Sequence, residues 1–356
     1  MIVQTLEISE KERTVAEHRY SRLQRNRVVI IVSIAIACLI SFCFDMATGP
    51  SSLPVKDVLL TVLSSSSVDE ATRVIIWNIR MPYAVMALLV GMSLSIAGAE
   101  MQTVLNNPLA SPFTLGVSAA ATLGAALAIV LGITLPGISS EWIVSLNAFL
   151  FAFGSVLLLQ LLARWKNADA GVLVLFGIAL VFTFNALVAL IHYVASPEAL
   201  QQVVFWSMGS LARSNWEKIQ LLVLVMMAVI PFTIRSHWKM TALRLGEEKA
   251  MGLGINVKRL RFASLFRISL LAASSVAFVG TIGFIGLVGP HIARMLVGED
   301  HRYWFPASMM TGALLMSLAS IASKLLVPGT LLPVGIVTAL VGVPVFISLI
   351  LQRTNR

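Results

Sequence analysis

Long apolar runs separated by short polar segments make up the chain from residue 28 almost to its C-terminal end. Each run is close to the ~20 residues that an α-helix needs to cross the hydrocarbon core of a bilayer. The two-residue alternation of a membrane β-strand is absent, so helices are the expected spanning element. The pattern predicts an all-α, polytopic transmembrane bundle of about ten helices. By residue number they cover about 28–44, 82–105, 113–131, 142–163, 171–195, 217–234, 262–279, 281–297, 306–327 and 333–351.

The composition excludes a soluble globular domain. Of the 356 residues, 58% are hydrophobic and 12% are charged, whereas soluble domains average roughly 45–50% apolar and about 25% charged residues. The net charge of +9 would suggest nucleic acid in a soluble protein. In a membrane protein the enrichment of Lys and Arg in cytoplasmic loops explains it, and no nucleic-acid partner is expected.

The distribution of this charge predicts the topology. With ten helices and a cytoplasmic N-terminal end, most of the 26 Lys and Arg residues fall on the cytoplasmic side. Both termini are therefore expected in the cytoplasm. Residues 1–27 are predicted to form a basic cytoplasmic tail, and residues 28–356 the transmembrane domain.

The segment 235–267 is the longest strongly charged interruption between the apolar runs, and only Glu247 and Glu248 oppose its Lys and Arg residues. Glycines at 246, 252 and 254 divide it, and the pattern predicts two short helices over about 240–245 and 247–251. Two such helices on the cytoplasmic face form a compact shape that another protein can bind. The alternative is a solvated loop that only fixes the orientation of the chain.

Small residues recur every three or four positions in several predicted helices, as at Gly91, Ser95 and Gly98. Such faces allow helices to approach closely in lipid, and packing alone explains most of them. The run in the helix predicted over 281–297 goes further. Its members are Gly280, Gly283, Gly286, Gly289 and Pro290. Because irregular backbone at membrane depth is tolerated only inside protein or beside a water-filled path, this run is predicted to be a hinge or a pathway wall.

The chain has no motif for energy conversion or catalysis. It lacks a G-x-x-x-x-G-K-[ST] phosphate loop and an H-E-x-x-H or Cys/His cluster. Cys38 and Cys43 are interpreted as lipid-facing or packing thiols, so no metal site is expected. Glu100 is the one acidic residue within an apolar run; it is predicted to reach the interface, with a role in the conduit as the alternative. The sequence therefore predicts a conduit driven by an external motor.

Four sequence blocks make a family resemblance specific. They are IRMPYAVMALLVGMSLSIAGAEMQTVLNNPLASPFTLGVSAAATLGA, LGEEKAMGLGINVKRLR, FVGTIGFIGLVGPHIARMLVGEDHRYWFPASMMTGALLMSLAS and LLPVGIVTALVGVPVFISLIL. Together they resemble the FecCD family, the permeases of ABC importers for iron–siderophores and vitamin B12. The resemblance runs from about residue 78 to the C-terminus.

The resemblance implies a second permease subunit, identical or related, together with two cytoplasmic ATPases and a periplasmic substrate-binding protein. It implies that the basic segment, about 235–261, contains coupling helices that contact the ATPase. The matching residues are Leu245, Gly246, Glu247, Ala250, Gly252, Leu253 and Gly254. Arg80 and Lys324 match basic residues that would dock the binding protein, although Tyr83 stands where the family often has a second Arg.

The predicted function is that of an inner-membrane permease subunit, surrounded by lipid, that moves a ferric siderophore inward by ATP-driven alternating access. The resemblance suggests that the helices over 113–131, 171–195 and 281–297 line the path. No cofactor is expected on this chain, because ATP and Mg²⁺ would bind the partner ATPase. The alternatives are a cobalamin or haem permease and an ion-coupled secondary carrier, which would require membrane-buried acidic residues. A membrane-embedded enzyme would require clustered catalytic side chains, and the sequence contains no such cluster.

Overall fold

The computed structural model describes residues 10–49, 54, 58, 60–61, 69–133, 136–165, 170–327 and 329–354. Within these ranges the regular secondary structure is helical, and no β-strand occurs. Residues 1–9 of the predicted tail fall outside the described residues, as do Pro328 and most of the residues between 50 and 68.

The ten predicted spans each correspond to a helix. Seven helices of the described chain are long and apolar enough to cross a membrane. They comprise α1 (Glu10–Ala47), α4 (Met81–Val104), α6 (Ser140–Trp165), α7 (Ala170–Val194), α9 (Trp216–Arg235), α12 (Val257–Val279) and α14 (His301–Leu325). Shorter apolar helices occupy the other three positions, namely α5 (Val117–Val130), α13 (Ile285–Val297) and α15 (Val334–Thr354).

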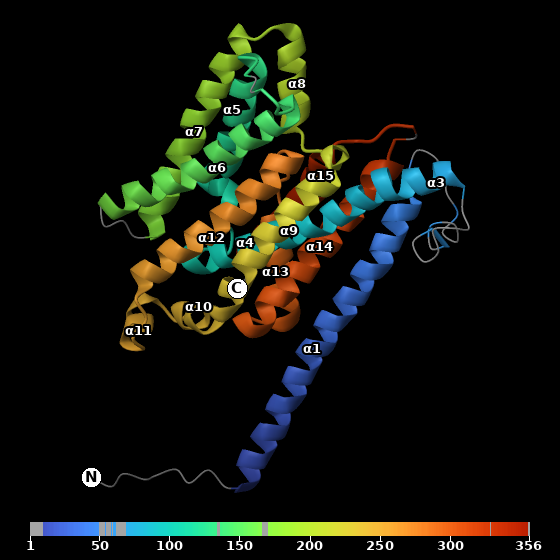
Figure 1. Ribbon diagram of the computed structural model, residues 1–356. Helices are drawn as coiled ribbons and strands as arrows, with labels where there is room; N and C mark the ends of the chain where they lie inside the picture. The colour runs from blue at the N-terminus through green and yellow to red at the C-terminus, as the bar shows by residue number, and fades with distance from the viewer. Residues whose placement is uncertain are drawn as a thin grey trace.

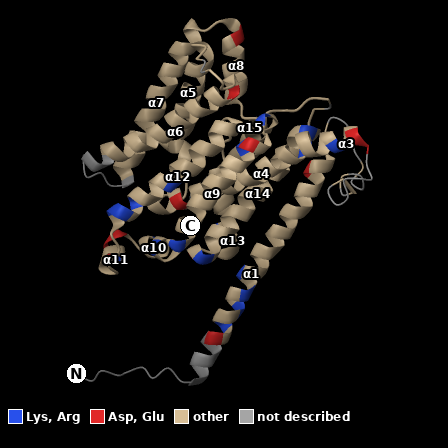
Figure 2. Cartoon of the chain, in the orientation of Figure 1, with Lys and Arg blue, Asp and Glu red and all other residues tan. Residues whose placement is uncertain are grey.

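Short helical elements connect these spans. They are α3 (Glu70–Val74), η1 (Ile75–Arg80), η2 (Pro112–Leu115), α8 (Pro197–Ser207), η3 (Leu211–Arg213), α10 (His237–Leu243) and α11 (Glu247–Gly252). In Figure 1, α10, α11 and the N-terminal end of α1 lie at one end of the bundle, and α3 and α8 lie at the other. Lys and Arg gather mainly at the first of these ends (Figure 2). We call it the basic end, and the other the opposite end.

Two helices begin earlier than the predicted spans. Residues 10–27 form the first part of α1, so the described part of the tail is helical and continuous with the first span. Residues 70–77, interpreted from the sequence as part of a polar external loop over 45–77, are also helical, and residues 78–80 continue them directly into α4. Pro82 was taken as a helix start because it cannot donate to the preceding turn. The chain instead continues through the π-helical turn Ile75–Arg80, which changes the hydrogen-bond spacing ahead of the proline.

Helix α4 is the centre of the bundle and packs against α14, α13, α12 and α9. Close approach of backbones makes this possible. A Cβ added to Gly91 would overlap the carbonyl oxygen of Gly312 in α14, and one added to Gly98 would overlap that of Gly286 in α13. These glycine faces therefore serve helix packing, in which small residues let neighbouring backbones approach each other in lipid.

Replacing Gly98 with Val should destabilise the bundle, because the new side chain meets backbone atoms that cannot move aside. We expect a loss of at least about 3 kcal/mol, at the upper range for overpacking. The measurement is the thermal unfolding midpoint of detergent-purified protein. Gly154→Val is the matched control, since a Cβ at Gly154 has nothing within 4 Å. Equal midpoints for the two variants would contradict the packing role of Gly98.

Candidate functional site

Helices α10 and α11 form the compact pair of short helices that the sequence predicts, and they lie at the basic end (Figure 1). Gly246 begins α11 with φ of +108°, and Gly254 follows it with φ of +79°. Both values lie in the region that glycine adopts without strain. A Cβ at Gly246, Gly252 or Gly254 would meet nothing within 4 Å. The glycines therefore shape the turn and leave its outer surface open.

The predicted coupling residues divide into exposed and inward-facing groups. Leu245 and Leu253 expose 59% and 56% of their surface, and Met251 beside them exposes 56%. Exposed apolar side chains that cluster on a polar face are typical of a protein-binding surface. Ala250 is fully buried, and Glu247 forms an ion pair with Arg261 of α12. Buried Ala250 and the ion pair of the exposed Glu247 hold α11 against the bundle, while the exposed apolar side chains are free to contact a partner.

Glu100 is buried, and the interpretation that it reaches the interface was wrong. Its exposure is 0%. Arg267 of α12 donates from Nε to Glu100 Oε1 at 2.9 Å, and Thr233 of α9 donates to Oε2 at 3.4 Å. Arg267 was counted with the basic segment, but it lies within α12, which begins at Val257. The pair ties α4 to α12 near the basic end.

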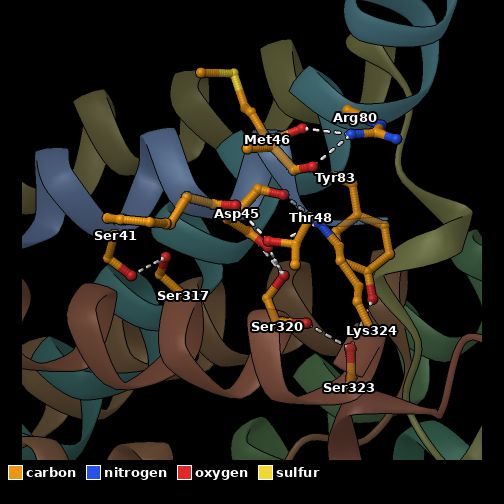
Figure 3. A network of polar contacts seen from close by, with 12 residues as sticks. Ser41, Asp45, Met46, Thr48, Arg80, Tyr83, Ser317, Ser320, Ser323 and Lys324 are labelled. Atoms are coloured by element: carbon orange, nitrogen blue, oxygen red, sulfur yellow. Dashed lines mark hydrogen bonds and ion pairs between the residues drawn. The ribbon is translucent and has the colours of Figure 1, made fainter. Parts of the chain in front are cut away.

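A second buried ion pair lies near the opposite end and involves a residue that the sequence analysis missed (Figure 3). Asp45, which directly follows the first predicted span, is fully buried in α1. Lys324 Nζ of α14 donates to its Oδ1 at 2.7 Å, and Ser320 Oγ donates to the same carboxylate at 2.7 Å. Lys324 also lies over the ring of Tyr83, 4.4 Å from its centroid. The pair joins α1, α4 and α14.

Both predicted docking residues therefore lie together, and both are largely buried. Lys324 exposes 8% of its surface and Arg80 exposes 5%. Arg80 Nη1 donates to the carbonyl oxygens of Met46 and Ala47, at 3.0 and 2.9 Å. Their side chains thus serve contacts within the chain. A docking role for them stays a prediction.

A cavity of about 640 Å³ lies where the backbone between α12 and α13 is irregular. Gly280 has φ of +81° and Phe284, a non-glycine residue, has φ of +66°. Thr281, Gly283 and Phe284 line the cavity. The lining side chains carry no charge; the others are Leu109, Ser111, Phe113, Thr114, Ser118, Ser207, Met208, Leu287, Gly335, Ile336, Ala339, Leu340 and Phe346.

The four glycines of the predicted hinge form two pairs with different surroundings. Gly280 and Gly283 belong to the irregular segment beside the cavity, and their role as a pathway wall stays a prediction. Gly286 and Gly289 instead face α4, where added Cβ atoms would meet the Leu94 carbonyl and the Ser95 side chain. Pro290 lies within α13, and its carbonyl oxygen accepts from Trp304 Nε1 at 2.7 Å.

The residues that line the cavity differ from those expected of a pathway. Its wall includes the start of α13 and residues at η2 and the start of α5, in agreement with two of the three predicted helices. Helix α7, the third, contributes no lining residue, whereas α15 contributes several. The ring of Phe284 lies against Gly342 of α15, where a Cβ would overlap the phenylalanine.

The cysteines pack as predicted. Cys38 is buried, and its Sγ donates to the Met310 carbonyl oxygen at 3.2 Å. Cys43 is also a free thiol. Among the described residues, no group of three or more His, Cys, Asp or Glu side chains could hold a metal ion.

The described chain thus combines a bundle of helices long enough to cross a membrane, two short helices at the basic end and a cavity with uncharged lining side chains. The sequence profile of the FecCD transport family matches residues 36–352. The chain belongs to this family and is an ABC importer permease.

Relatives and one solved structure agree with this assignment. The hemin transport system permease protein HmuU of Yersinia pestis is 33% identical, over 87% of this chain and 93% of the relative. The Fe(3+)-citrate import system permease protein YfmE of Bacillus subtilis is 35% identical, over 93% and 97%. Vitamin B12 and molybdate permeases also match. A solved ABC transporter in an inward-facing conformation, described as being of a metal-chelate type, has a TM-score of 0.80 at 31% identity over 91% of this chain and 99% of its own.

Removing one member of the buried Asp45–Lys324 pair should cost about 3–5 kcal/mol of stability, because the other charge stays buried without a counter-ion. We therefore expect Asp45→Asn and Lys324→Met each to lower the thermal unfolding midpoint. The double variant Asp45→Asn/Lys324→Met should lie closer to the wild type than Asp45→Asn alone. A double variant whose loss equals the sum of the two single losses would show that the pair does not act as a unit.

Proposed function

We propose that the chain moves a ferric siderophore into the cell, as the permease subunit of a binding-protein-dependent importer. The observation that carries the proposal is the uncharged wall of the 640 Å³ cavity. A large organic chelate can contact such a wall through its ligand shell, whereas a small hydrated oxyanion would lose water without gaining a charged partner. The Fe(3+)-citrate named as the substrate of one relative supports an iron chelate.

The transport cycle is alternating access driven by partner subunits. Two permease chains, identical or related, surround the path in the inner (cytoplasmic) membrane of a bacterium, and a periplasmic binding protein delivers the substrate. Two ATPases at the basic end bind ATP and Mg²⁺, so this chain is not itself an enzyme. The exposed side chains of Leu245, Met251 and Leu253 support the site of ATPase contact, since they present an apolar surface beside open glycines.

Binding-protein docking is assigned to the region of Arg80 and Lys324 at the opposite end. Their burial limits the contact to the edges of the two side chains. Charge of this kind directs association more than it adds affinity.

A haem or cobalamin permease is the second candidate within the class, and a hemin permease among the relatives favours it. The two buried acids argue against an ion-coupled carrier. Asp45 is paired with Lys324 and Glu100 with Arg267, so each carboxylate already has a fixed counter-ion. Exchange of a coupling ion at either site would leave a buried cation without its partner.

The substrate assignment predicts the outcome of uptake measurements with the complete transporter in proteoliposomes. An iron-loaded hydroxamate siderophore should be imported with ATP, and an excess of the same siderophore should compete with its own labelled form. Haemin, cyanocobalamin and molybdate serve as competitors under the same conditions. Uptake of one of these compounds without siderophore uptake would reject the ferric siderophore and identify the alternative.

Replacing Gly254 with Val should weaken ATPase association, since a β-branched residue at φ of +79° strains the turn that follows α11. We expect at least about a tenfold loss of copurified ATPase, equivalent to ~1.4 kcal/mol. Gly132→Val is the control, because Gly132 also has positive φ and open surroundings but lies outside the coupling segment. Normal ATPase copurification with folded Gly254→Val protein would remove this turn from the contact.

A further inference from the structure

Besides the apolar packing of Met240 and Leu243, helix α10 contacts the bundle through one buried histidine. His301, the first residue of α14, is 1% exposed. Its Nδ1 lies 3.0 Å from Thr241 Oγ1 of α10, and its Nε2 lies 2.8 Å from Thr103 Oγ1 of α4. A neutral imidazole donates at one ring nitrogen and accepts at the other, so one ring satisfies both bonds. The ring therefore links α10, α4 and α14.

A second contact from α10 reaches the turn just before His301. Arg244, at the end of α10, forms an ion pair with Glu299 in the turn between α13 and α14. The hydrogen bond from Arg244 holds the pKa of the Glu299 carboxyl below its ordinary value. Because 53% of the Glu299 side chain is exposed, solvent screens this pair. The buried contact at His301 is the stronger of the two.

The junction that receives these contacts is tightly joined to α13. Trp304 of α14 donates from Nε1 to the Pro290 carbonyl of α13 at 2.7 Å. The guanidinium of Arg294 in α13 lies 4.5 Å from the centroid of the Trp304 ring. The His301 ring packs edge-on against Trp304, with centroids 4.8 Å apart. A displacement of His301 therefore carries the C-terminal part of α13 with it.

The other end of α13 borders the cavity. The helix begins at Ile285, directly after the irregular residues Thr281, Gly283 and Phe284 that line the wall. Its 13 residues span about 20 Å at 1.5 Å per residue. Helix α11 has a different attachment, since Glu247 pairs with Arg261 of α12. Helices α11 and α10 of the coupling segment are thus attached to different spans. Of these two short helices, α10 is the one whose contacts reach α13, through the start of α14.

We propose that α13 carries movement of the coupling segment to the cavity, and that His301 is the positioning residue that connects α10 to it. The proposal rests on the proposed function, because it assumes that an ATPase moves α10. A shift of α10 displaces the α13–α14 junction through the Thr241–His301 bond. The irregular segment 280–284 then absorbs the movement at the cavity wall, where Gly280 already has φ of +81°.

The test uses the complete transporter with its ATPase and binding protein in proteoliposomes, and measures the number of substrate molecules imported per ATP hydrolysed. His301→Phe removes both ring bonds, keeps the aromatic packing and leaves the weaker bond from the residue 301 backbone N–H to Thr241. It leaves the Thr103 and Thr241 hydroxyls bonded to the carbonyl oxygens of Ala99 and His237. Thr241→Val removes both bonds that the Thr241 hydroxyl accepts or shares with His301 and leaves the Thr103 bond intact, and Thr241→Ser restores the hydroxyl. Thr122→Val is the control, since the Thr122 hydroxyl bonds only to the Ser118 carbonyl within its own helix.

We expect His301→Phe and Thr241→Val to assemble with the ATPase and hydrolyse ATP, but to import about fivefold less substrate per ATP, in proportion to a lost buried hydrogen bond. Thr241→Ser and Thr122→Val should match the wild type. A residue needed only for folding would lower assembly and leave this ratio intact. Wild-type ratios in both variants would overturn the proposal, and so would a Thr241→Ser variant as poorly coupled as Thr241→Val.

The same measurements separate this proposal from the proposed function. If His301→Phe fails to fold, Thr241→Val decides, because it retains the histidine ring. A wild-type complex that hydrolyses ATP and imports substrate, with unchanged coupling in Thr241→Val, rejects only the role of His301. A wild-type chain that recruits no ATPase and imports nothing rejects the importer itself.

Discussion

A charge inside a bundle that faces lipid must find its counter-ion within the bundle, and this constraint decides how the helices are joined. Asp45 and Glu100 have no exposed surface, and each is paired with a cation from another helix. The Asp45–Lys324 pair joins α1 to α14, and the Glu100–Arg267 pair joins α4 to α12. Because an unpaired partner would be costly, the two pairs fix which helices can be neighbours.

Glycine packing is the second constraint, and it acts on helices that these ion pairs join. The carbonyl groups of Gly286 and Gly312 occupy the space that side chains would take at Gly98 and Gly91. Helices α4, α13 and α14 therefore meet backbone to backbone, and attraction between their surfaces replaces the hydrophobic effect that is absent within lipid. At the basic end, α10 packs against two of these three helices, α4 and α14.

The sequence predicted the long helices and the two short helices at the basic end well, because both depend on local pattern. Apolar run length determines where helices cross, and glycines at 246 and 254 require backbone that other residues avoid. It did not predict that Glu100 meets Arg267 or that Asp45 lies inside α1, since helix neighbours are separated by hundreds of residues in the chain. The role of His301 was likewise not predictable, because the sequence contains five scattered histidines. Only the fold brings two threonines next to its ring.

The position of the Phe284 ring affects the size of the molecules that the cavity can admit. Its aromatic ring occupies the space in front of Gly342 that any larger residue would fill. A relative with alanine at the equivalent position could not keep the ring there and would have to swing it elsewhere. Since this ring belongs to the cavity wall, the width of the cavity at this point depends on the absence of one methyl group on the facing helix.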